Sequence, residues 1–238
     1  MIKGNNDLLE DQKGMRERIG TESIWTIDLV SLLHHLLNTK QQQHKSDIAN
    51  NKRTEPNSIN APLSYVFCST KFRVEESYNL LGYYKDAYQD DLLRVERLFA
   101  LAEQERMPLL KVSMMSLNFL VDFVSKKGCV AIVLIDNRVL VSQCSNCNDH
   151  ILDASDTSTI NTYSGHYVIL CGISYDSNDV NYAKSHCLED FVGDENYCMV
   201  LKNPGSWKEQ EFVSKKRFES AWRANGTDED AILIHFHC

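Results

Sequence analysis

The sequence predicts an α+β fold in a single domain. Segments with helical periodicity lie mostly in the first half of the 238-residue chain, and apolar strand-like runs lie mostly in the second half. Helices and strands segregated in this way are typical of α+β proteins. The length suits one large domain or two small ones. We expect one domain over residues 23–238, after a polar segment at 1–22.

Four segments combine the apolar spacing of an amphipathic helix with a residue suited to start one. In the first, residues 23–37, Ile and Leu recur at helical intervals. The four predicted helices start at Ser23 or Thr26, at Asp90, at Ser116 and at Ser214, and the last two stop near Gly128 and Gly226.

Residues 38–62, "NTKQQQHKSDIANNKRTEPNSINAP", differ from the segments on either side. They are rich in Gln, Asn, Lys and Ser and poor in apolar residues. Such a segment buries too little apolar surface to order itself, so the composition predicts a disordered insertion within the domain.

Six apolar or alternating runs predict strands. The run "CVAIVLID" is continuously apolar, which is typical of a strand covered on both faces. Polar loops are expected at 137–163 and 176–196. The predicted strands are 63–70, 108–114, 129–136, 166–173, 197–202 and 231–236.

Composition excludes some classes of partner. The net charge is −8, which argues against binding to nucleic acid because that binding relies on a basic surface. The longest apolar run, Cys129–Ile135, is too short to cross a membrane, and the first 20 residues do not resemble a signal peptide. We therefore expect a protein of the cytoplasm or nucleus, without membrane contact and with reduced cysteines.

His166 and Asn203 are the first candidate site residues. His166 begins one predicted strand, and Asn203 ends the next, just before Pro204. If these strands are antiparallel neighbours, the two side chains lie within reach of each other. An amide that accepts a hydrogen bond from an imidazole orients it as a general base, as in a Cys–His–Asn site. The alternative is a strand-end histidine and an asparagine that caps a turn.

Several motifs resemble one known family. "SIWTIDL", "RVERLFALA", "VAIVLID", "SGHYVILCG", "LKNPGS" and "GTDED" occur in this order, and together they resemble the guanylyl cyclase domain-containing proteins of animals and plants. That family in turn resembles papain-like cysteine peptidases of the bacteriocin-processing type. The resemblance implies a papain-like fold, with a curved antiparallel sheet flanked by helices. It also implies that His166 is the base and Asn203 its orienting residue.

The resemblance includes a nucleophile that this chain does not show in the expected place. The family carries Asp-Cys-Gly-x-x-Cys on a helix upstream of "SIWT", whereas the first cysteine here is Cys68. We therefore expect the nucleophile helix to be absent. Its loss would expose apolar surface of the sheet, which predicts either marginal stability or a protein partner that covers this surface. The ligand would be GTP or peptide-like. Cys171 follows His166 at an odd offset, so strand alternation predicts opposite faces for the two side chains.

The family name implies conversion of GTP to cyclic GMP, which would need Mg²⁺ or Mn²⁺ held by carboxylates. Asp228, Glu229 and Asp230 are the candidate acidic cluster. The alternative is a solvated acidic turn between the last helix and the last strand. The alternative to cyclase activity is that the chain is a catalytically dead papain-like module with a binding or regulatory role.

A weak zinc motif lies in the polar loop at 137–163. Cys144, Cys147 and His150 have the spacing of half a zinc site, and His186 or Cys187 could complete it. The alternative is two loop thiols without a metal.

Overall fold

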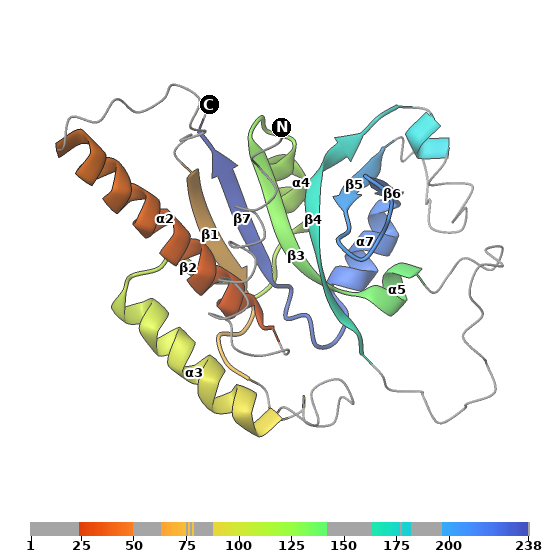
Figure 1. The fold of residues 1–238 in the computed structure, drawn as a ribbon. Helices are drawn as coiled ribbons and strands as arrows, with labels where there is room; N and C mark the ends of the chain where they lie inside the picture. Colours follow the sequence, from red (N-terminus) through yellow and green to blue (C-terminus); the bar gives the residue numbers. More distant parts are fainter. Residues whose placement is uncertain are drawn as a thin grey trace.

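The computed structural model describes residues 24–49, 63–74, 76, 78, 88–141, 163–176, 178–181 and 197–237. In this part of the chain a twisted seven-stranded sheet lies between two layers of helices (Figure 1). The α+β class that the sequence predicts is confirmed. None of the described helices combines the length and the apolar character of a membrane span.

The sheet is mostly antiparallel. Its strand order is β2-β1-β7-β3-β4-β5-β6, and only β1 and β2 are parallel neighbours. The last strand in the chain, β7, therefore lies near the middle of the sheet, between β1 and β3. The strands are β1 Leu63–Ser69, β2 Leu109–Lys111, β3 Cys129–Asp136, β4 Gly165–Ser174, β5 Cys198–Lys202, β6 Glu211–Val213 and β7 Ala231–Phe236.

Helices pack on both faces of the sheet and divide the core in two. One apolar cluster joins α2 and α3 to one face, and the other joins α4 and α7 to the opposite face, where Trp222 and Phe218 are fully buried. The described helices with assigned bounds are α2 Thr26–Ala49, α3 Tyr88–Gln104, α4 Leu117–Val124, α5 Asn137–Val141 and α7 Lys215–Trp222.

Two of the four predicted helix starts have the predicted cap residue, whereas α3 begins two residues before Asp90 and Ser23 lies outside the described residues. Ser214 precedes α7, and its Oγ accepts a hydrogen bond from the Arg217 backbone N–H at 3.1 Å. Ser116 precedes α4 in an extended conformation, but its side chain makes no capping hydrogen bond. The cap position is thus confirmed at both helices, and the capping contact at one.

Three elements correct the sequence-based boundaries. Helix α2 runs to Ala49, so residues 38–49 of the predicted disordered insertion are helical, and 50–62 lie outside the described residues. Gln and Lys are good helix formers, and extending a helix is far easier than starting one. Helix α5 lies inside the polar loop predicted at 137–163, and the three-residue strand β6 was not predicted. Elements this short carry little periodicity.

Candidate functional site

His166 and Asn203 come from neighbouring antiparallel strands, as the sequence predicts. In the register between β4 and β5, Leu170 is opposite Leu201. His166 is four residues before Leu170, and Asn203 is two residues after Leu201, so both side chains lie on the face of these two leucines. This face packs against α4 and α7.

The two side chains are in direct contact. His166 Nε2 lies 2.7 Å from Asn203 Oδ1, a short hydrogen-bond distance. Two further hydrogen bonds fix the orientation of the Asn203 amide. The Gly205 backbone N–H donates to Oδ1 at 2.9 Å, and Nδ2 donates to Glu211 Oε2 at 3.2 Å.

The orientation of the amide decides the tautomer of the imidazole. Asn203 Oδ1 can only accept hydrogen bonds, so Nε2 of His166 carries the proton. In the neutral ring, Nδ1 then keeps its lone pair and can accept a proton. The arrangement can therefore present a general base at His166 Nδ1.

Gly205 and Glu211 are site residues that sequence reasoning missed. A Cβ atom at Gly205 would lie 3.2 Å from His166 Cε1 and 3.3 Å from Asn203 Oδ1, so a larger residue here would push on the pair. The Asn-Pro-Gly sequence is a turn signal that could have indicated Gly205. Glu211 carries no such signal, because its position depends on the pairing of β5 with β6.

The described cysteines are poor nucleophiles. Cys68 and Cys198 are buried, and burial raises the pKa of each thiol to about 11. Burial also raises the pKa of Cys171, whose Sγ donates to the Ile169 carbonyl at 3.6 Å. Cys171 lies where the register of β4 and β5 shifts, so strict alternation does not decide its face. Cys129 is buried, as expected of a small core residue.

Asp228 begins the acidic turn and points toward β1. Its carboxylate accepts a hydrogen bond from the Tyr78 hydroxyl, and Oδ1 is 3.2 Å from Lys71 Nζ. Its carbonyl accepts from the backbone N–H and the hydroxyl of Thr70. Asp228 and Glu229 both have positive φ, 50° and 53°, so the chain turns sharply here.

The other two carboxylates point elsewhere. Glu229 bonds Arg223 Nη1 at 2.7 Å and accepts from the Met115 backbone N–H at 2.9 Å. Asp230 accepts a hydrogen bond from the Thr26 hydroxyl at the start of α2. Because the three carboxylates diverge toward different partners, they do not form a site for Mg²⁺ or Mn²⁺.

The environment of Asp230 differs from the solvated acidic turn that was the alternative to a metal site. Its Oδ1 is buried, and burial together with the nearby Asp228 charge raises the pKa of Asp230 to about 8. Hydrogen bonds from Ser69 and Thr26 oppose this shift. The turn therefore ties together β1, β7 and the start of α2.

The zinc motif Cys144, Cys147 and His150 lies outside the described residues, as do His186 and Cys187. Within the residues that the structure describes, no three His, Cys, Asp or Glu side chains are arranged to hold a metal ion.

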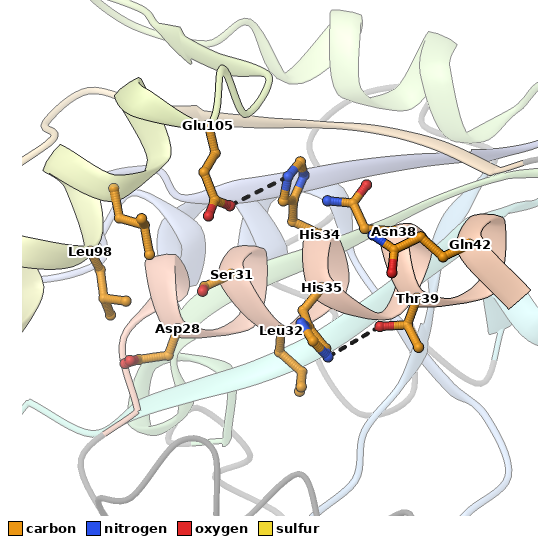
Figure 2. A pocket seen from close by; sticks show the side chains of 11 residues that line it. Asp28, Ser31, Leu32, His34, His35, Asn38, Thr39, Gln42, Leu98 and Glu105 are labelled. Carbon is orange, nitrogen blue, oxygen red and sulfur yellow. Dashed lines mark hydrogen bonds and ion pairs between the residues drawn. The ribbon is translucent and has the colours of Figure 1, made fainter.

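A separate cleft of about 400 Å³ lies between α2 and α3 (Figure 2). These two helices pack on the face of the sheet opposite to the one that carries His166. His34 lines this cleft. Its Nδ1 is 2.9 Å from the Tyr65 hydroxyl, and its Nε2 is 3.6 Å from Glu105 Oε2. Burial and the Glu105 charge raise the pKa of Tyr65 to about 12. The described lining includes Asp28 and Glu105 but neither Lys nor Arg, so it is poorly suited to phosphate groups.

Comparison with known proteins shows the family. A family model described as "Guanylylate cyclase" matches residues 2–234. The chain belongs to this guanylylate cyclase family. A relative named "Guanylyl cyclase 1", from Arabidopsis thaliana, is 26% identical over 227 residues, which cover 95% of this chain and 64% of the relative. The chain thus spans less than two thirds of that family member. No solved structure matches it.

The family match agrees with the resemblance carried by the sequence motifs, which is confirmed. The matched region contains His166, Asn203 and the acidic turn. The family match by itself gives no role to these residues. Their geometry is the evidence for what they can do chemically.

Proposed function

We propose that His166 and Asn203 are the general base and the orienting residue of a thiol-hydrolase-type site on a papain-like arrangement. One observation carries this proposal. Asn203 Oδ1 lies 2.7 Å from His166 Nε2 in an amide orientation that two other hydrogen bonds support. A histidine that only ended a strand would not need its partner's amide held in one orientation.

The chemistry follows from the tautomer. With Nε2 bonded to the amide, Nδ1 can take a proton from a thiol and later return it to the leaving group. The amide stabilises the imidazolium that forms between these steps and keeps the ring in place. The substrates of such a site are acyl compounds, of which peptides and related amides are the most common.

The proposal predicts a cysteine whose reactivity depends on His166. Purified protein treated with iodoacetamide near neutral pH should show one rapidly alkylated cysteine other than the described Cys68, Cys129, Cys171 and Cys198, identified by peptide mass spectrometry. His166→Ala should slow that reaction at least about 100-fold, because it removes the general base. His35→Ala is the matched control, since His35 is exposed on α2, where it hydrogen-bonds Thr39 and lies far from the His166–Asn203 pair on the other side of the sheet. Equal labelling of wild type and His166→Ala would contradict the proposal.

Formation of cyclic GMP from GTP is the second candidate, and the family description and the name of the Arabidopsis relative favour it. The described residues offer it little support, because the acidic turn does not form a metal site and the described lining of the α2–α3 cleft includes neither Lys nor Arg. The test is incubation of the protein with GTP and Mg²⁺ or Mn²⁺, followed by mass spectrometry for cyclic GMP.

Product that increases with protein concentration and survives in Asp228→Asn would support cyclase activity at a site other than the acidic turn. Product lost in Asp228→Asn but not in Lys71→Met would place the chemistry at the turn after all. No product with either metal would remove this candidate. If the alkylation assay is also blank, a binding or regulatory module on the same fold is the function that remains.

A further inference from the structure

Glu211 lies behind Asn203, on the side away from the imidazole. We propose that Glu211 is a positioning residue that holds the Asn203 amide in the orientation that makes His166 Nδ1 a base. The inference rests on the proposed function for its catalytic meaning, but its effect on the imidazole can be measured without any substrate.

The sheet register brings Glu211 to this position. Glu211 is opposite Leu201 in the pairing of β6 with β5. Asn203 follows Leu201 by two residues, just after the end of β5. The Glu211 and Asn203 side chains therefore share one face at the edge of the sheet. Their contact, Nδ2 to Oε2 at 3.2 Å, follows from this arrangement.

The amide needs such a contact because its two ends are nearly the same shape. If the Asn203 amide rotated by half a turn, Nδ2 would face His166, and Nε2 would have to accept a hydrogen bond. The proton of the neutral ring would then move to Nδ1, and the base would be lost. A carboxylate that only accepts opposes this rotation, because it would face the amide oxygen.

The Gly205 backbone N–H favours the same orientation, by donating to Oδ1 at 2.9 Å. It is a neutral donor, whereas Glu211 offers a charge-assisted bond, which is roughly twice as strong. Glu211 is also half-buried, so water competes with this bond less than at an exposed site. We therefore assign the larger share of the orientation to Glu211.

The experiment reads the tautomer of His166 by long-range ¹H–¹⁵N NMR in mildly alkaline buffer. The His166 signal is assigned with His166→Gln. Wild type should show the Nε2–H form alone. Glu211→Ala should add the Nδ1–H form. Glu211→Gln keeps a side-chain oxygen that can accept from Asn203 Nδ2, so it should show the same Nε2–H form as the wild type. Glu209→Ala removes an equal charge from an exposed position two residues away, and should change nothing.

Glu211→Met is a second variant that keeps the side-chain stem and its packing, in case Glu211→Ala does not fold. An unchanged Nε2–H tautomer in both Glu211→Ala and Glu211→Met would overturn the inference and assign the orientation to Gly205. The same change in Glu209→Ala would overturn it too, because the effect would then be one of charge alone. An Nδ1–H form in the wild type would instead contradict the proposed function, so the two failures are distinguishable.

Discussion

Replacing Arg94 with methionine should lower the free energy of unfolding by about 3–5 kcal/mol. Arg94 bridges two buried carboxylates, with Nη2 2.7 Å from Asp91 Oδ1 and Nη1 bonded to Asp28. The side chains of Asp28 and Asp91 are only 4% and 2% exposed. Methionine keeps much of the apolar stem but leaves these carboxylates without their cation. Urea denaturation at neutral pH measures the loss.

Arg97 supplies the control for this prediction. It is exposed on the same helix, so Arg97→Met should change the stability by less than about 0.5 kcal/mol. The triple variant Arg94→Met, Asp28→Asn, Asp91→Asn should recover much of the loss, because no buried charge remains unpaired. A loss of similar size in Arg94→Met and Arg97→Met would show that the ion pair does not stabilise the contact between α2 and α3.

Asp230 should make the protein less stable as the pH rises from about 4 to about 8. Its pKa is about 8 in the folded chain, against an ordinary value near 3.9 when unfolded. Between these values the folded state holds a proton that the unfolded state has released, so stability falls with rising pH. This one group contributes a slope of up to about 1.4 kcal/mol per pH unit.

Asp230→Asn isolates that contribution, because the amide has the same shape as the protonated acid and does not titrate. Its amide oxygen can still accept the hydrogen bond from Thr26. Urea denaturation from pH 4 to pH 9 should show a flatter stability profile for the variant, and greater stability than the wild type at the alkaline end. Parallel profiles for the two proteins would show that Asp230 titrates normally in the folded state.

The pairing of His166 with Asn203 could be predicted because it depends on local information. Each residue stands at an end of a strongly apolar strand, and consecutive strands often pair. Adjacency of antiparallel strands then places the two side chains together. The structure confirms this contact, while the catalytic role of the pair stays a proposal.

The surroundings of that pair depend on contacts that leave little trace in the sequence. Strand β6 has three residues, too few to show alternation, so Glu211 could not be placed behind Asn203. The register shift between β4 and β5 likewise falls beside Cys171, so simple alternation, which assigns this residue to the face opposite His166, does not decide its face.

In the acidic turn, too, the sequence showed the residue types, but their partners depend on tertiary contacts. Three adjacent carboxylates in a turn were expected either to bind a metal or to be solvated. Which partners they take depends on segments far away in the chain: Asp228 meets β1, and Asp230 meets Thr26 at the start of α2. The desolvation of Asp230 arises only when these segments pack together.

The sequence by itself determined the α+β class, most of the strands, the starts of α4 and α7, and the contact between His166 and Asn203. These features depend on periodicity and on side chains close along the chain, which a sequence records directly. Only the tertiary structure decided the strand order, the hydrogen bonds that orient Asn203 and the buried environment of Asp230. Burial and hydrogen-bond partners come from residues that meet only after folding, so no local pattern specifies them.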